Sequence, residues 1–209
     1  MRVLALDGAL ARCSALIRED GRVLARRVQD GPRGHASLLP ALAREVLAEA
    51  GGGACDAVAV TVGPGGFTGL RAAIALARGF ALGWGVPCLG VTLGEAFAAS
   101  LPESERDGQA LWVAVDTKRG RIALERPDAM PAVFAAADLP RPMGPVLLAG
   151  DAAEAAAEAL RAMGADVRLT ALRLPEPEGV AAVAAQRLRG ELPPREAEPL
   201  YLEPPAVRG

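Results

Sequence analysis

Residues 58–87 constrain the fold of this chain more than any other stretch. They begin with an apolar run rich in β-branched residues, 58–62, which is typical of a buried strand. Glycine and proline then fill positions 63–66, which predicts a sharp turn with close backbone approach. A helix is expected over about 69–83, with the Thr68 hydroxyl as its cap. The stretch therefore predicts a strand, a turn and a helix in direct succession.

This helix is unusual because Arg71 and Arg78 are its only charged residues, whereas a surface helix of a monomer normally has a polar face. Two stripes run along it at helical spacing. One stripe is apolar and consists of Leu70, Ile74, Ala77, Ala81 and Trp84. The other, here called the small-residue face, allows close approach of a second helix and consists of Ala72, Ala75, Gly79 and Gly83. Either the whole helix is buried inside its own domain, or the apolar stripe packs on a sheet and the small-residue face packs on a partner chain.

The remaining pattern predicts an α/β protein in two similar halves. The first half is expected as βββαβαβα, with strands at 3–6, 13–17, 22–28, 58–62 and 86–91 and helices at 36–50, 69–83 and 93–101. A polar segment at 102–108 suggests a boundary, giving domains 1–102 and 103–209. The second half is expected as a hairpin (110–115 and 121–125), strands at 146–149 and 165–169, helices at 152–163 and 178–189, and an extended end at 195–205 that packs back on the body. A weak similarity between the halves suggests a duplicated fold whose second copy is reduced.

Composition excludes several classes of function. The net charge of −2 gives no dense basic patch for nucleic acid. No uncharged apolar run is long enough to span a bilayer, and the chain starts with a strand-like segment instead of a signal peptide. Three widely spaced cysteines, Cys13, Cys55 and Cys88, fit reduced thiols better than a disulfide framework. We therefore expect a cytoplasmic protein without a membrane segment.

The sequence contains few candidate catalytic residues. His35 is the only histidine and no cysteines are closely paired, so no metal site is expected. A serine triad would need His35 as its base, and no serine lies in a nucleophile elbow. Paired carboxylates for acid–base work stay open, although scattered acidic residues are usually solvated surface. His35 is interpreted as a helix-start residue.

A phosphate site is the strongest of the catalytic interpretations. Residues 63–69 connect a strand to a helix N-terminus, where backbone amides favour anions. The weak candidate residues for nucleotide binding are Asp7, Gly8, Gly65 and Gly66. The turn matches neither the Walker nor the dinucleotide pattern, and tight packing of strand and helix explains its glycines equally well. No bound cofactor is expected.

Four segments together resemble the bacterial TsaB (YeaZ) family: Leu4-Ala5-Leu6-Asp7, residues 34–40 with Gly34-His35, residues 63–71, and the closing Pro199-Leu200-Tyr201-Leu202. The resemblance implies the actin-like ATPase (ASKHA, ribonuclease H-like) fold. It also implies a non-catalytic dimerisation subunit of the complex that transfers a threonylcarbamoyl group to N6 of the tRNA adenosine beside the anticodon. The implied partners are a catalytic TsaD-type subunit and a TsaE-type ATPase, with tRNA contacted only indirectly. A homodimer of the isolated chain and a nucleotide at the complex interface stay open.

In catalytic relatives of this family a two-histidine metal motif lies on the first helix. Its two positions here are His35 and Leu39, so that chemistry is missing. The expected partner interface uses the two helices at 36–50 and 69–83, through His35, Leu38, Leu42, Arg71, Ala72, Ala75, Arg78, Gly79 and Leu82. The alternative is an independent enzyme on the same fold, either an ATP-dependent phosphotransferase or a glycoprotease-like peptidase.

Overall fold

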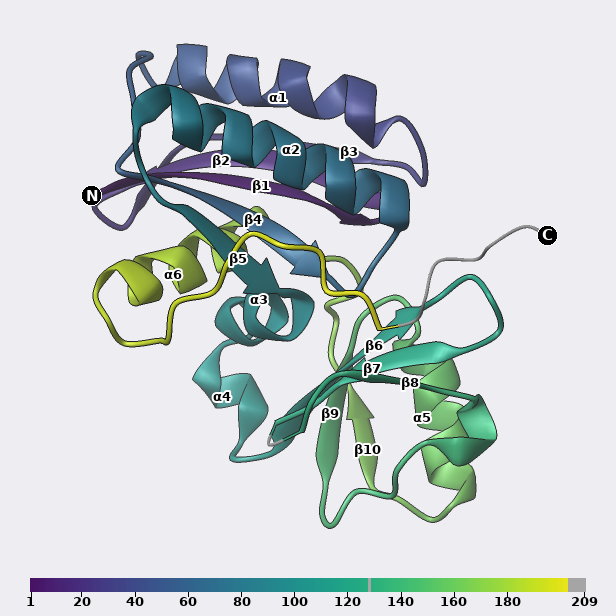
Figure 1. The fold of residues 1–209 in the computed structure, drawn as a ribbon. Helices are drawn as coiled ribbons and strands as arrows, with labels where there is room; N and C mark the ends of the chain where they lie inside the picture. Colours follow the sequence, from purple (N-terminus) through teal and green to yellow (C-terminus); the bar gives the residue numbers. More distant parts are fainter. Residues whose placement is uncertain (128, 203–209) are drawn as a thin grey trace, which may run out of the picture.

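A computed structural model describes residues 1–127 and 129–202 of the chain. Its elements follow in the order β1 (Arg2–Leu10), β2 (Arg12–Glu19), β3 (Arg22–Asp30), α1 (His35–Glu49), β4 (Ala57–Gly63), α2 (Phe67–Trp84), β5 (Cys88–Thr92), α3 (Leu93–Ser100), α4 (Glu103–Arg106), β6 (Ala110–Asp116), β7 (Ile122–Glu125), β8 (Ala132–Phe134), η1 (Ala136–Asp138), β9 (Val146–Ala149), α5 (Ala153–Ala162), β10 (Val167–Leu169) and α6 (Pro177–Leu188). Figure 1 shows the first sheet with α1 and α2 along its outer side, and the second sheet with α5 beside it.

The two sheets have the same strand order and the same strand directions. The first is ordered β3-β2-β1-β4-β5 and the second β8-β7-β6-β9-β10. In each, an antiparallel meander of three strands is followed by two parallel strands. The second copy has only the short 3-10 turn η1 where the first has α1. This confirms the α/β prediction of two related halves with the second one reduced.

Strand alternation explains the layers around the first sheet. Leu4 and Leu6 of β1 pack into the core under α1 and α2, whereas Val3 and Ala5 face the core formed with α6. Successive side chains of a strand point to opposite faces, so the continuous apolar run at residues 3–6 of β1 requires cover on both. The two consecutive crossovers put α1 and α2 in contact on one face.

A third apolar core joins the two halves. Leu93 and Phe97 of α3 pack in it against Leu111 and Val113 of β6, together with Leu70 of α2. The helix α3 therefore lies between the sheets and contacts both β5 and β6. This core fixes the two halves against each other and sets the geometry of the site described below.

The predicted elements are confirmed within a few residues, with one wrong cap and three short elements that were not predicted. The helix α2 begins at Phe67 with Gly66 as N-cap and no side-chain cap, so the prediction that Thr68 caps it was wrong. The helix starts as soon as the glycine turn ends, which puts Thr68 inside its first turn. The short elements α4, β8 and η1 were not predicted. For β8 the reason is that it owes its strand form to pairing with β7.

The division of the chain at residue 102 remains a proposal. The second sheet is built from residues after it, but α6 contacts β1 and β2 of the first sheet. The tail also lies on the first half, where Gly90 donates a 2.9 Å hydrogen bond to Arg195 and Leu200 donates a 2.8 Å bond to Val62. The part of the expected extended end at 203–205 lies outside the described residues.

Cys13, Cys55 and Cys88 are free thiols, as predicted. Within the described ranges, no helix combines the length and apolar character needed to cross a bilayer.

Candidate functional site

A cleft of about 500 Å³ lies between the two halves. Its walls are the end of β1, the glycine turn before α2, the hairpin turn after β6 and the C-terminal tail. Three of the four weak nucleotide candidates, Gly8, Gly65 and Gly66, line it. The fourth, Asp7, is buried just behind them.

The glycines of the turn allow two backbone segments to touch. A Cβ on Gly65 would lie 2.4 Å from the carbonyl oxygen of Ala9, and one on Gly69 would lie 2.2 Å from that of Gly8. The amide of Gly66 donates a 2.7 Å hydrogen bond to Ala9. At this distance no side chain fits between β1 and α2, so close packing accounts for these glycines. One amide of the turn is therefore committed to the protein backbone.

Asp7 is fully buried at the end of β1. Its Oδ1 accepts hydrogen bonds from the hydroxyl of Thr61 at 2.6 Å and from the amide of Ala9 at 3.1 Å. Its Oδ2 has no hydrogen-bond partner among the described residues. Burial raises the pKa of this carboxyl to about 6, against the opposing effect of the Thr61 bond. Asp7 is thus a buried carboxyl behind the cleft, with its charge destabilised.

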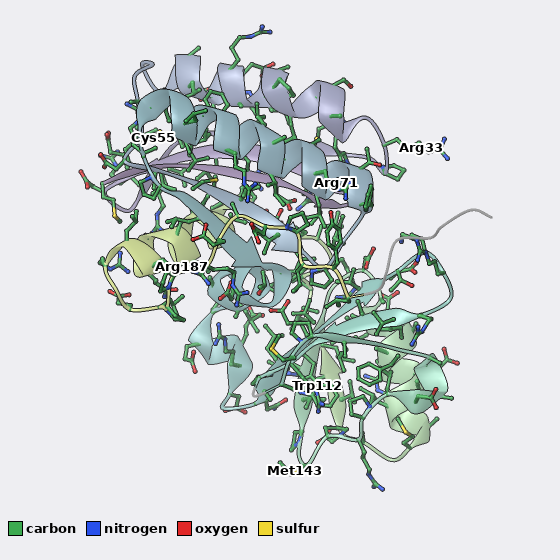
Figure 2. The ribbon with its side chains drawn as sticks, viewed as in Figure 1. Arg33, Cys55, Arg71, Trp112, Met143 and Arg187 are labelled. Atoms are coloured by element: carbon green, nitrogen blue, oxygen red, sulfur yellow. The ribbon has the colours of Figure 1, made fainter. Side chains whose placement is uncertain are left out.

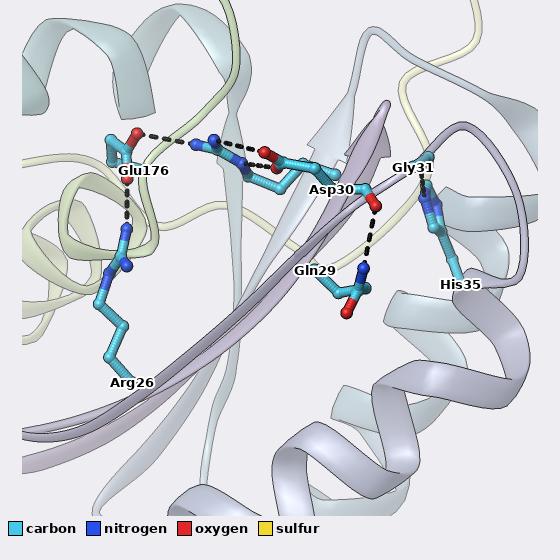
Figure 3. Close-up of polar contacts among 7 residues, drawn as sticks. Arg26, Gln29, Asp30, Gly31, His35 and Glu176 are labelled. Atoms are coloured by element: carbon cyan, nitrogen blue, oxygen red, sulfur yellow. Dashed lines mark hydrogen bonds and ion pairs between the residues drawn. The ribbon is translucent and has the colours of Figure 1, made fainter.

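His35 is the first residue of α1, as the sequence predicted. Figure 3 shows its ring beside Gly31, whose carbonyl oxygen lies 2.9 Å from Nε2. On the other side of the ring, Nδ1 lies 3.3 Å from the carbonyl oxygen of Gly8. Only 8% of the residue is exposed. His35 joins the start of α1 to the end of β1, and its burial leaves little of its side chain for the partner contact that the sequence predicted.

The position of a second histidine in the metal motif is occupied by Leu39, which is 1% exposed in the first core. In the parts of the chain that the structure describes, no group of three histidine, cysteine, aspartate or glutamate side chains is arranged to hold a metal ion.

The opposite wall of the cleft contributes a polar cluster that the sequence reasoning missed. Lys118 Nζ lies 2.9 Å from Asp116 and 3.3 Å from Asp151. The amide of Asp116 also donates to Asp151 at 2.8 Å. The hydrogen bond to Asp116 raises the pKa of Lys118. The sequence contained a signal for this cluster. Asp116 ends β6 in the second sheet, and Asp7 lies near the end of β1, which is the corresponding strand of the first sheet.

The second candidate surface is the outer side of α2. Its apolar stripe is largely buried, whereas Ala75, Gly79 and Gly83 of the small-residue face are exposed and Ala72 is half-buried. Leu82, beside that face, is 86% exposed. Among the other predicted interface residues, Arg71 and Arg78 are exposed, and Leu38 and Leu42 of α1 are half-buried. The helix therefore carries an unpartnered face of small residues.

An aromatic–arginine cluster of Phe67, Arg71 and Tyr201 stands where this face meets the cleft. Figure 2 labels Arg71 near the end of α2 that faces the tail. Its guanidinium carbon lies 3.7 Å from the centre of the Phe67 ring, and its Nε donates a 2.7 Å hydrogen bond to the Tyr201 hydroxyl. All three residues line the cleft.

Comparisons with known proteins place this geometry in a family. The family model described as "TsaD: tRNA N6-adenosine threonylcarbamoyltransferase" matches residues 29–129. The tRNA threonylcarbamoyladenosine biosynthesis protein TsaB of Escherichia coli is 33% identical over 58% of this chain and 53% of its own length. The chain thus matches about half the length of that relative. An uncharacterised protein of Mycobacterium tuberculosis is 37% identical over 74% of each chain.

Solved structures extend the match to nearly the full chain. A Pseudomonas aeruginosa protein described as similar to the peptidase YeaZ superposes with a TM-score of 0.80 at 28% identity, covering 97% of this chain and 99% of its own. The paired sheets and the cleft between them define an actin-like ATPase fold. Within that class, the chain belongs to the TsaB/YeaZ family. The resemblance inferred from the four sequence segments is confirmed.

Proposed function

We propose that this protein is a non-catalytic dimerisation subunit of the complex that attaches a threonylcarbamoyl group to N6 of the tRNA adenosine next to the anticodon. Its role is to bind a catalytic TsaD-type subunit, with a TsaE-type ATPase as a further partner. The observation that carries the proposal is the exposed small-residue face of α2, in a chain related to TsaB. A monomer rarely leaves such a face without a partner.

The family match supports a related chain as the partner. The TsaD family model matches residues 29–129, which include both α1 and α2. Two chains that each contain such a helix pair can associate about a pseudo-two-fold axis, so that the helix pair of one chain packs on the helix pair of the other. Small residues suit such a four-helix interface because they let the helix axes come close. An obligate interface of this kind buries roughly 2,000 Å² or more. The same surface suits a homodimer of the isolated chain.

The cleft supports a non-catalytic role for this subunit. The family's catalytic histidine pair is reduced to the buried His35, with Leu39 at the second position. In the glycine turn, the Gly66 amide donates its hydrogen bond to the Ala9 carbonyl oxygen, so it does not point to a phosphate. Asp7, Gly8, Gly65 and Gly66 remain candidates for contact with a nucleotide only at an interface with the partner. We propose that tRNA is contacted indirectly, because a chain of net charge −2 gives little counterion release, and that the complex is cytoplasmic.

The experiment that tests the proposal is co-expression with the TsaD-type subunit of the same organism, comparing the native chain with Gly79→Leu by size-exclusion chromatography. A Cβ on Gly79 meets no atom within 4 Å, so the variant should fold normally. Its side chain would hold the partner helix away, and overpacking costs about 1–3 kcal/mol, roughly a tenfold to hundredfold loss of affinity. We expect a folded variant that no longer co-elutes.

Ala155→Leu is the matched control, because Ala155 is an exposed small residue on α5 in the second half. It should co-elute like the native chain. Co-elution of Gly79→Leu, or failure of the native chain to bind, would contradict the proposal. The alternative functions predict a different result: ATP turnover or peptide cleavage by the purified chain, abolished by a point change in it.

A further inference from the structure

The C-terminal segment 195–202 lies along the free edge of β5, as Figure 1 shows for the tail running between α2 and the second half. Glu196 forms an antiparallel bridge with Leu89. A Cβ on Gly90 would lie 2.2 Å from the carbonyl oxygen of Glu196, so only glycine allows this contact. Ala197 is 2% exposed and belongs to the first core. The segment is therefore fixed on the first half at several points.

From this edge the segment reaches the outer side of α2 twice. Glu198 Oε1 lies 3.5 Å from the guanidinium of Arg78. Three residues further along the tail, the hydroxyl of Tyr201 accepts the hydrogen bond from Arg71. The ring of Tyr201 also lies 6.0 Å from that of Phe67, centre to centre. The tail thus orients both arginines that flank the small-residue face.

Arg71 differs from Arg78 in its partners. Across residues 1–127 and 129–202, no carboxylate forms a described ion pair with Arg71, whose neighbours are a phenol and an aromatic ring. Its charge is held in place but not neutralised. The Tyr201 oxygen accepts from Arg71, so its own hydrogen is free to point outward. A carboxylate arriving at the cluster can accept from the terminal nitrogens of Arg71 and from the Tyr201 hydroxyl together.

We propose that the aromatic–arginine cluster is a carboxylate-binding site for an aspartate or glutamate of the TsaD-type subunit, in which Tyr201 of the tail positions Arg71. This inference rests on the proposed function and adds the tail to the docking surface. Exposure fits the role: Phe67 is 47% and Tyr201 51% exposed although both rings lie beside a cation. The site also borders the small-residue face, so one partner helix can use both.

The test measures the dissociation constant of the complex for the native chain and for three variants. Arg71→Gln removes the charge, and we expect roughly a tenfold to hundredfold weaker binding from loss of a charge-assisted hydrogen bond. Tyr201→Phe keeps the ring but loses the hydroxyl, and should weaken binding about three- to tenfold. Arg71→Lys keeps a charge without the planar fork and should fall between the native chain and Arg71→Gln.

Arg189→Gln is the control for charge loss, because Arg189 pairs with Glu191 just after α6, away from α2. It should bind like the native chain. The affinity of the native chain should fall as salt concentration rises, and Arg71→Gln should flatten that dependence. Thermal unfolding of each variant checks that the fold is intact.

The outcomes separate this inference from the proposed function. If Gly79→Leu abolishes the complex while Arg71→Gln and Tyr201→Phe bind like the native chain, the carboxylate site is wrong and the dimerisation role stands. If the native chain does not bind the partner, both are overturned. If free glutamate at low concentration displaces the TsaD-type subunit from the native chain, the cluster is a site for a small-molecule carboxylate, which also contradicts the proposal.

Discussion

At the scale of single residues, Asp7 is the clearest case of a side chain whose chemistry is set by burial. It ends up with one oxygen bonded and the other without a partner among the described residues. Removing water from a carboxylate favours its neutral form, so Asp7 binds a proton more tightly in the folded chain than in the unfolded chain. The consequence is a measurable dependence of stability on pH.

The prediction compares the native chain with Asp7→Asn. The folded pKa of Asp7 is raised from 3.8 to about 6, so its contribution to stability is present below the unfolded pKa and is lost as pH rises through about 6. Asparagine does not titrate. Between about pH 4 and pH 7 the native chain should lose up to about 3 kcal/mol of unfolding free energy relative to the variant. Urea denaturation across that range measures it.

Asp30→Asn is a control of opposite sign. A hydrogen bond from Arg12 lowers the pKa of Asp30, so this carboxylate stabilises the fold above its unfolded pKa and loses that effect as pH falls. Arg12 forms ion pairs with Asp30 at 2.7 Å and with Glu176 at 2.8 Å. A stability difference between the native chain and Asp7→Asn that does not change with pH would show that burial does not raise the pKa of Asp7 in the folded chain.

At the scale of elements, α2 is divided between two environments. Its first turn lies against β1, whereas the middle of its outer side is open. Two glycines of this helix therefore differ in whether a side chain fits at their position. Gly69 is needed for the backbone contact with Gly8, and Gly79 has no such contact inside this chain.

The matched pair Gly69→Ala and Gly79→Ala tests this division. A methyl group on Gly69 meets backbone at 2.2 Å and the Nδ1 of His35 at 2.7 Å, so overpacking should cost about 1–3 kcal/mol or more. The same change at Gly79 should stabilise the helix by roughly 0.5–1 kcal/mol, since alanine loses less backbone entropy. Equal effects on the urea midpoint would contradict the assignment of the two faces.

At the scale of the whole molecule, a half-buried polar contact helps to join the two halves. Glu125 at the end of β7 accepts a 2.8 Å hydrogen bond from the amide of Gly94 and another from the hydroxyl of Thr92. Both donors lie at the N-terminus of α3, where a negative charge is favourable. A Cβ on Gly94 would lie 2.4 Å from the Glu125 carboxyl carbon, so the glycine admits the carboxylate. Burial raises the pKa of Glu125, against the lowering effect of the Thr92 bond.

The contact continues into α6. Thr92 also forms a capping box with Glu95, and Glu95 pairs with Arg187, whose side chain is 1% exposed. Figure 2 labels Arg187 on α6. The second sheet, α3 and α6 are therefore linked through consecutive polar contacts, alongside the third apolar core.

Glu125→Ala should lower the unfolding free energy by about 1–2 kcal/mol, because it leaves donors at the start of α3 without their acceptor. Glu158→Ala, at an exposed position on α5, is the control and should change it by less than about 0.5 kcal/mol. Chemical denaturation followed by tryptophan fluorescence suits the test, since Trp112 lies in the second half and Trp84 in the first. No difference between the two variants would mean that the contact does not hold the halves together.

Much of this architecture could be read from the sequence, because it follows from local backbone geometry. The continuous apolar run of β1, the hairpin at Asp20-Gly21 with both residues at positive φ, and the turn before α2 are short-range patterns that predict their own structure. The two stripes of α2 were likewise visible as helical spacing. The sequence left open which stripe is buried.

That choice depends on which elements pack together, so only the tertiary structure decided it. The apolar stripe is covered by the sheet, and the small-residue face stays open in this chain. Arg71 meets Tyr201 across 130 residues of sequence, and Glu125 reaches the start of α3 across 31. Contacts of this kind join segments that no local periodicity relates. Helices and strands are encoded by neighbouring residues, whereas the cleft, the aromatic–arginine cluster and the link between the halves arise only when distant segments are brought together.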